Sequence, residues 1–177
     1  MTSWTLRFAT NADIAAVVTL VESAYRGDSS RAGWTTEAEL LDGRRTDADE
    51  VRDAIERAHS IIMLAERKGQ LHACAHVAIE DDAGSFGMFA VHPSQQGRGI
   101  GKLLLTEAER IVRDDWHLAT IRMSVIDLRA ELIAFYERRG YVRTGIYKPF
   151  PYGDERFGSP KRDDLRFEIL EKRLVVG

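Results

Sequence analysis

Three glycines stand within five residues in the stretch QQGRGIGKLLL, which covers 95–105. Two basic side chains, Arg98 and Lys102, stand among them, and an apolar run with helical spacing follows at once. Backbone N–H groups at a helix N-terminus bind anions, because the positive end of the helix dipole lies behind them. Glycines let a phosphate approach the main chain closely and permit positive φ angles. The stretch is therefore predicted to be an anion site, with a plain glycine turn before a helix as the alternative.

Two familiar phosphate-binding motifs do not fit these residues. A P-loop needs a glycine five residues before its Gly-Lys pair and a Ser or Thr after it, but Gln96 and Leu103 occupy those positions. A dinucleotide fingerprint, G-x-G-x-x-G, needs a third glycine, and that position falls on Lys102 or Leu104. What remains is a Q-x-x-G-x-G pattern that begins at Gln96, between a predicted strand and a predicted helix.

The elements that position this stretch are predicted from hydrophobic periodicity and from turn residues. Strands are expected over 4–10, 60–67, 70–80, 85–91, 119–125, 141–147 and 164–174. Helices are expected over 11–27, 46–59, 99–114 and 128–140, with a shorter segment at 35–43. Asn11 is expected to cap the first helix, and Asp47 pairs with Glu50 in a predicted capping box. This order indicates an α/β fold with mixed α+β layers.

Composition limits the classes of protein that fit. The chain has 177 residues, 44% hydrophobic and 30% charged, which is typical of a single globular domain over 1–177. A net charge of -3 offers no broad basic face for nucleic acid. One cysteine excludes an internal disulfide framework, so a cytoplasmic location is expected. No signal peptide and no apolar run near the ~18 residues of a membrane span are seen, so no membrane partner is expected.

A second sequence block, further along the chain, helps to interpret the glycine stretch. MFAVHPSQQGRGIGKLLL, over 88–105, is followed further along by ELIAFYERRGY, over 131–141. The two blocks, in this order, resemble the signature of the GNAT superfamily of acyl-CoA N-acyltransferases, and the resemblance covers essentially the whole chain. It implies a central, mostly antiparallel sheet of about seven strands, splayed at the CoA site and flanked by about four helices.

The resemblance also implies roles for individual residues. Acetyl-CoA is the implied cosubstrate, and its pyrophosphate would lie on the backbone of Gln96, Gly97, Arg98, Gly99, Ile100, Gly101 and Lys102. Main-chain groups of Phe89, Ala90 and Val91 would pair with the pantetheine arm as another strand, at a β-bulge near Phe89. Phe135 would line the CoA channel. Tyr136 would be the general acid that protonates the departing thiolate, the alternative being that it only packs on an amphipathic helix.

The acceptor side is less defined by the sequence. The acceptor amine must lose a proton before it attacks, but the strand segment GSFGMFAV carries no acid. A water chain, Glu37 or a group from the C-terminal loop are the open choices for the base. Two loops, over 25–37 and 148–164, are expected near the acceptor, with dimer contacts or a solvated flap as the alternative. The candidate acceptor residues in them are Arg26, Trp34, Glu37 and Tyr152.

Two further patterns bear on metals and on assembly. His72, Cys74 and His76 alternate along a predicted strand and so are expected to share a face. His72 and His76 would lie ~13 Å apart, too far to hold one ion, so no metal is expected. The last strand, 164–174, is expected to leave an unpaired edge that needs cover. Because the resemblance implies that such C-terminal strands often meet a partner, a homodimer is predicted.

The resulting hypothesis is an N-acetyltransferase. It would move an acetyl group from acetyl-CoA to a primary amine of a small molecule or peptide, by direct attack in a ternary complex. The lone Cys74 on a strand disfavours an acyl-enzyme. Two alternatives remain: a non-catalytic acyl-CoA-binding sensor with the same fold, and a toxin-like enzyme that acetylates a charged tRNA, which the net charge of -3 disfavours.

Overall fold

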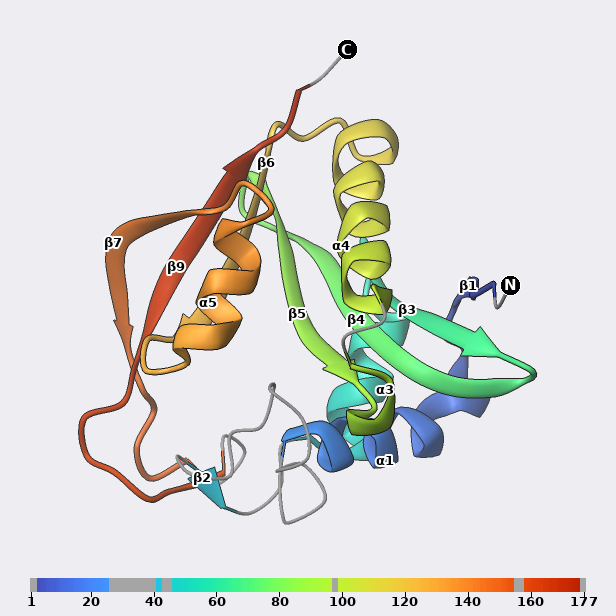
Figure 1. Ribbon diagram of the computed structural model, residues 1–177, viewed down its shortest axis with the longest axis horizontal. Coiled ribbons are helices and arrows are strands. Elements are labelled where there is room, and N and C mark those ends of the chain that lie inside the picture. Colours follow the sequence, from blue (N-terminus) through green and yellow to red (C-terminus); the bar gives the residue numbers. More distant parts are fainter. Residues whose placement is uncertain (1–2, 26–40, 43–45, 97–98, 155–157, 176–177) are drawn as a thin grey trace.

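The computed structural model describes residues 3–25, 41–42, 46–96, 99–154 and 158–175 (Figure 1). Seven strands form one sheet in the order β1-β3-β4-β5-β6-β9-β7. Their bounds are β1 Thr5–Phe8, β3 Ser60–Arg67, β4 Gln70–Glu80, β5 Ala83–Val91, β6 Thr120–Ile126, β7 Val142–Pro149 and β9 Arg166–Arg173. All neighbours are antiparallel except β5 and β6, which are parallel. Two short strands, β2 (Leu41–Asp42) and β8 (Ser159–Pro160), pair separately.

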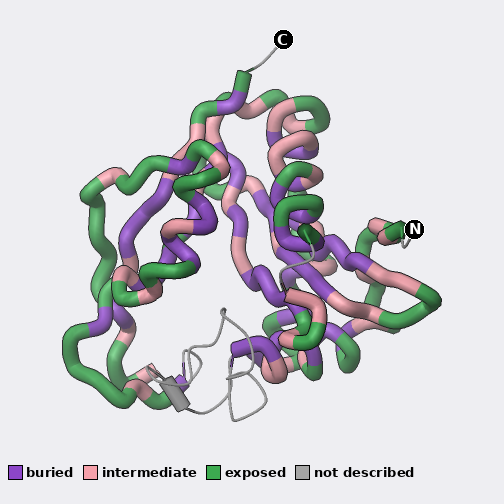
Figure 2. The backbone as a smooth tube through the Cα atoms, in the orientation of Figure 1, coloured by how far each residue is buried: buried purple, intermediate pink, exposed green. Residues whose placement is uncertain are grey.

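Helices cover both faces of the sheet. They are α1 (Ile14–Tyr25), α3 (Ala48–Glu56), α4 (Ile100–Arg110) and α5 (Ala130–Glu137). The apolar sides of α4 and α5 pack into one core on one face, and those of α1 and α3 form a second core against β3, β4 and β5 on the other. Figure 2 shows this burial along the central strands, whereas β7 is mostly exposed. The expected mixed α/β fold with a mostly antiparallel sheet is confirmed.

The helix N-termini follow local hydrogen bonding. Asp47 caps α3 as predicted, since its side chain accepts from the backbone N–H of Glu50 at 2.8 Å. Asn11 was the expected cap of the first helix, and that expectation is wrong. Thr10 is the cap of a short 3₁₀ turn, Asn11–Asp13, that leads into α1. The Asp13 carboxylate accepts from the backbone N–H of Thr10 at 2.8 Å, so the first turn begins one residue before Asn11.

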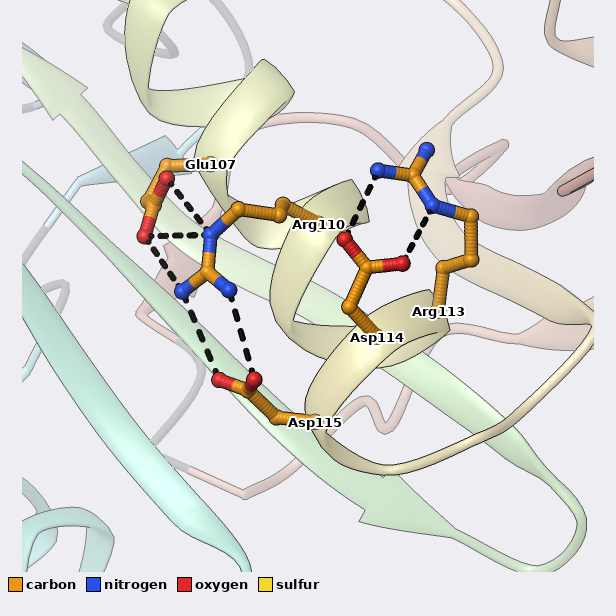
Figure 3. Close-up of polar contacts among 5 residues, drawn as sticks. All are labelled: Glu107, Arg110, Arg113, Asp114 and Asp115. Atoms are coloured by element: carbon orange, nitrogen blue, oxygen red, sulfur yellow. Dashed lines mark hydrogen bonds and ion pairs between the residues drawn. The ribbon is translucent and has the colours of Figure 1, made fainter. Parts of the chain in front are cut away.

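Helix α4 is extended by a wide turn. The predicted helix over 99–114 begins at Ile100, becomes a π-helical turn over Ile111–Asp115 and ends before Trp116. Exposed ion pairs surround this turn (Figure 3): Arg110 bonds both Glu107 at 2.8 Å and Asp115 at 3.3 Å, and Arg113 bonds Asp114. Such solvent-exposed pairs contribute little stability each, so the turn depends mainly on its buried apolar side.

The C-terminal strand is not an edge. β9 lies between β6 and β7 and pairs with both, so the expectation of an unpaired edge on the last strand is wrong. β7 is the edge instead. Its register shifts between Arg143 and Tyr147, and it carries Gly145 at φ 73 and ends in Lys148 and Pro149. Bulges, lysine and proline are features that discourage edge-to-edge pairing. No described helix is both long and apolar enough to span a membrane.

Candidate active site

Strands β5 and β6 separate soon after they meet. Their parallel pairing consists of Gly84 with Ile121 and Ser85 with Arg122. β5 then continues to Val91 while β6 runs away from it (Figure 1). Beyond Ser85, the side of β5 that faces β6 therefore has backbone groups that this neighbouring strand does not pair. An extended ligand can use such groups as it would a sheet edge.

A β-bulge lies within the separated part of β5. The β4–β5 register passes from Cys74 with Ala90 to His76 with Gly87, so two β5 residues, Met88 and Phe89, oppose one residue of β4. Met88 has φ 47, a left-handed conformation that is uncommon outside glycine. The bulge predicted near Phe89 is confirmed.

Aromatic side chains pack behind the bulge. Phe89 stacks on Phe135 with ring centres 5.8 Å apart. Tyr136 contacts Phe89 at 6.3 Å and Phe135 at 5.4 Å, and it is 3% exposed. A Cβ on Gly101 would lie 2.7 Å from the Phe89 ring, so only glycine lets the first turn of α4 approach this closely. The packing brings the bulge, the start of α4 and the end of α5 together.

The start of α4 forms a groove of about 220 Å³. Gly99 is the N-cap, with φ 79, and the amide of Gln96 donates to the Val91 carbonyl at 3.0 Å, which holds the turn against the end of β5. The residues that line the groove are Val91, Gln96, Gly99, Ile100, Gly101, Lys102, Phe135, Arg138 and Arg139. Most residues predicted for the CoA turn therefore meet here, while Gly97 and Arg98 lie outside the described residues.

Arg138 and Arg139 were missed by the sequence reasoning. They follow Tyr136 at the C-terminal end of α5 and reach the groove from the opposite side. The Arg139 guanidinium lies 3.8 Å above the Phe135 ring and donates to the Phe135 carbonyl at 2.9 Å. Burial, and secondarily the charge of Arg138, lower the pKa of Arg139. The signal in the sequence was the pair of arginines beside the aromatic-Tyr motif.

The electrostatics of Tyr136 involve two residues that were also missed, Tyr25 and Arg129. Burial raises the pKa of Tyr136 well above its usual value, and Tyr25 adds to the increase. Arg129 acts in the opposite direction, because its positive charge favours the phenolate. The Arg129 guanidinium lies 5.2 Å from the centre of the Tyr25 ring. The phenol of Tyr136 is therefore protonated at neutral pH and has a cation nearby.

The proposed acceptor residues are only partly within the described chain. Arg26, Trp34 and Glu37 lie outside it. Tyr152 is exposed, and its hydroxyl donates to the Arg162 carbonyl at 3.1 Å and accepts from the Leu165 N–H at 2.8 Å. These contacts hold the C-terminal loop together and do not connect Tyr152 with Tyr136.

The histidines of β4 have structural contacts. The His72 ring meets Trp4 at 5.3 Å beside the first core, whereas Cys74 is buried in the second core. The β3–β4 register shifts next to His72, between Ala65 and Glu66, so the expected single face is interrupted. His76 lies 2.6 Å from the Ser60 hydroxyl. Among the described residues, no group of three or more His, Cys, Asp or Glu could hold a metal ion.

Comparison with known proteins finds similarity to N-acetyltransferases. Residues 58–143 match a family described as "Acetyltransferase (GNAT) domain". S-(2-succino)cysteine N-acetyltransferase of Bacillus subtilis (strain 168) is 43% identical over 58 residues, which are 32% of this chain and 35% of that protein. The chain thus matches only about a third of that relative's length.

Solved structures share the fold over nearly the whole chain. The ribosomal-protein-alanine N-acetyltransferase from Brucella melitensis has a TM-score of 0.70 at 21% identity, covering 96% of this chain and 99% of that one. The protein yncA from Salmonella typhimurium, solved with its cofactor acetyl-CoA, has a TM-score of 0.71 at 19% identity, covering 98% and 95%. At these identities the likeness shows the fold alone.

Proposed function

We propose that the chain is a member of the GNAT superfamily, whose domain model residues 58–143 match, and that it transfers an acetyl group from acetyl-CoA to a primary amine. The observation that carries the proposal is the separation of β5 from β6 at the bulge of Phe89, with Tyr136 packed against that bulge. The separated strand would pair with the donor's extended arm, the helix start would hold its phosphates, and the buried phenol would protonate the leaving thiolate.

The donor would follow the part of β5 with which β6 does not pair. The pantetheine arm would pair with the main chain of Phe89, Ala90 and Val91, and the pyrophosphate would lie on the α4 turn. Support comes from the open groove at that turn and from the positive φ of Gly99. The likeness to the Salmonella protein, which was solved with acetyl-CoA, supports the same donor.

The reaction would be a direct transfer. The nitrogen lone pair of the acceptor attacks the thioester carbonyl carbon, the C–S bond breaks, and the thiolate takes a proton from the phenol of Tyr136. The amine proton leaves to a base or water chain that is not assigned to a residue. A raised pKa keeps the phenol protonated but makes it a weaker acid, so the charge of Arg129 would assist the transfer. Cys74 is buried and donates to the Met88 carbonyl at 3.5 Å, which disfavours a role as nucleophile.

The acceptor would be a small molecule or a peptide amine. The curated relative acts on S-(2-succino)cysteine, an amino-acid derivative, and the Brucella protein acts on an alanine of a ribosomal protein. Both acceptors carry an α-amino group, so α-amines of amino acids and peptides are the first class to test. A cytoplasmic location and a homodimer remain part of the same proposal.

The test is a thiol-release screen with acetyl-CoA against amino acids, polyamines and peptides with free N-termini. Release that depends on an added amine, together with an acetylated product seen by mass spectrometry, would support the transferase. Tight acetyl-CoA binding with no transfer to any amine would favour the acyl-CoA sensor instead.

A further inference from the structure

Arg129 places a positive charge at the end of α5 that is away from the groove at the start of α4. It directly precedes α5, whereas Arg138 and Arg139, which line the groove, follow the last residue of that helix. The residues that line the groove do not include Arg129. Arg129 instead contacts Tyr25, the last residue of α1, where the loop expected near the acceptor begins.

The Tyr25 side chain connects Arg129 with the bulge of β5. The Arg129 guanidinium lies 5.2 Å from the centre of the Tyr25 ring, and the Tyr25 hydroxyl donates to the Phe89 carbonyl. The Tyr136 ring packs against the same phenylalanine, with ring centres 6.3 Å apart. Tyr25 thus links a partly exposed cation to the backbone on which the thioester is expected to lie.

The charges that act on the Tyr136 phenol do not favour a polycationic acceptor. Apart from burial, the pKa of Tyr136 responds to Tyr25, which raises it, and to Arg129, which lowers it. Among the described residues, no carboxylate acts on this phenol. Arg129 would repel an acceptor that carries further positive charges, such as a polyamine, and would attract an acceptor that carries a carboxylate beside its amine.

An α-amino acid carries its carboxylate one carbon away from its amine, so the two groups reach neighbouring parts of one site. An arginine guanidinium binds a carboxylate through two parallel hydrogen bonds. We propose that Arg129 binds the α-carboxylate of the acceptor, which makes a free α-amino acid, rather than a peptide N-terminus or a polyamine, the substrate class of this site. The inference rests on the proposed function, which leaves amino acids and peptides equally open.

The experiment compares matched acceptors at saturating acetyl-CoA. Each pair consists of a free amino acid and its C-terminal amide, such as glycine with glycinamide and methionine with methioninamide, taken across the common amino acids. The amide has the less basic amine, so chemistry alone favours the amide at one pH. We nevertheless expect kcat/KM to be about ten- to a hundredfold higher for the free acid, mainly through a lower KM, as charge-assisted hydrogen bonds predict. Spermidine, in the same assay, should be a poorer acceptor than the free acids.

Variants connect this preference with Arg129. Arg129→Gln should abolish the preference for the free acid. Its effect on Tyr136 is common to both members of a pair, so the ratio of their kcat/KM values isolates the contact with the carboxylate. Arg129→Lys keeps a charge near Tyr136 but loses the planar pair of donors, so it should lose less rate on amides than Arg129→Gln and still lose part of the preference.

Arg52→Gln on α3 is the matched control, because it removes the same charge from a half-exposed side chain elsewhere and should keep the full preference. Equal kcat/KM within every pair would overturn the inference and leave the proposed function intact, as would transfer to spermidine or peptides with none to free amino acids. A full preference in Arg129→Gln, or in Arg129→Lys if the first variant does not fold, would also overturn it. Transfer to no amine at all would contradict the proposed function itself.

Discussion

The phenol of Tyr25 donates a hydrogen bond to the carbonyl oxygen of Phe89 and so ties the end of α1 to the bulge of β5. Both residues are almost fully buried, Tyr25 in the second core and Phe89 in the first. The Phe89 side chain is held on the opposite side by Phe135. The bulge is therefore fixed from two cores, which keeps rigid the backbone on which the thioester is expected to lie.

The α4 turn should lose coenzyme A affinity when a side chain is added at Gly99. An added Cβ would meet no protein atom within 4 Å there, so the space is open for a ligand. Asparagine tolerates the left-handed φ of 79 and is the suitable substitution. Gly99→Asn should weaken acetyl-CoA binding at least about tenfold by calorimetry, because its amide would occupy the space of the pyrophosphate.

Gly69→Asn is the matched control for this variant. Gly69 has φ 74 in the β3–β4 hairpin and also has nothing within 4 Å of an added Cβ. The Gly69→Asn variant should retain full affinity for acetyl-CoA. An unchanged affinity in a folded Gly99→Asn protein would show that the pyrophosphate lies elsewhere.

Much of this site follows from local sequence, and the rest depends on tertiary packing. The bounds of β3 and β4 match the predicted strands, because alternation and the Lys68-Gly69 turn are local signals. The sequence predicted the helix over 128–140 but gave no role to Arg138 and Arg139, and only the packing of the folded chain places them at the groove. Likewise, no local sequence pattern predicts that Tyr25, at the end of α1, donates a hydrogen bond to the Phe89 carbonyl in β5.

The position of β9 was misjudged for a related reason. As the last strand in the chain it was expected at an edge, but it inserts between β6 and β7. Glu168 in its centre is buried, and its carboxylate is paired with Arg143 of β7 at 2.5 Å. A charge partner from a neighbouring strand cannot be predicted from the alternation of one strand, so the sequence does not reveal that β9 is central.

The homodimer stays a prediction, but the surface expected to form it is now β7 and no longer the last strand, β9. The exposed apolar side chains Val142 and Ile146 of β7, 65% and 59% exposed, are the part of this sheet that a second copy would cover. Light scattering at micromolar concentration should give twice the chain mass, and Val142→Lys should shift it toward the monomer. A monomeric mass for the unmodified chain would contradict the prediction.

Gly84→Ala should destabilise the fold where β5 meets β6. An added Cβ would lie 2.8 Å from Cγ1 of Val112 and closer still to Cγ2, and Val112 is fixed in the π-turn after α4. Such overpacking costs about 1–3 kcal/mol, measured as the free energy of unfolding in urea. Gly87→Ala, where nothing lies within 4 Å, should be close to neutral. The double variant Gly84→Ala/Val112→Ala should recover part of the loss, and no recovery would place the strain elsewhere.

The buried His76 should make the fold sensitive to acid. Burial, and secondarily the charge of Arg57, lower the pKa of His76 from 6.5 to about 4. The Ser60 hydroxyl donates to the Ala54 carbonyl, so the His76 Nε2–H is the donor toward Ser60. Between about pH 6.5 and 4, His76 is protonated in the unfolded chain but stays neutral in the folded chain. Stability is therefore full above this window and falls as pH decreases through it.

The free energy of unfolding should decrease by about 2 kcal/mol between about pH 7 and pH 5, measured by urea unfolding at each pH. His76→Gln keeps an amide donor for Ser60 but does not titrate, so its stability should change less over the same interval. Equal pH dependence in the two proteins would remove His76 as the cause.

Tyr136→Phe should reduce turnover and spare coenzyme A binding. The substitution removes one oxygen and keeps the ring that packs against Phe89, Phe135 and Tyr141, so the fold should survive. General acid catalysis contributes about 10²–10⁴-fold, or roughly 3–5 kcal/mol of barrier. If the ring only packs, the loss should be a few-fold at most. Tyr141→Phe, which removes a hydroxyl bonded to Glu109 instead, is the control and should leave kcat nearly unchanged.

Single-turnover kinetics should accompany the steady state, because slow product release can hide a defect in the chemical step. The raised pKa of Tyr136 adds a second expectation for the same protein. Since the phenol keeps its proton, the single-turnover rate should not fall between about pH 7 and pH 9. A near-native single-turnover rate for Tyr136→Phe would remove Tyr136 from the mechanism. A fall in the rate of the unmodified chain at alkaline pH, absent in Tyr136→Phe, would show that the phenol loses its proton far more easily than its burial predicts.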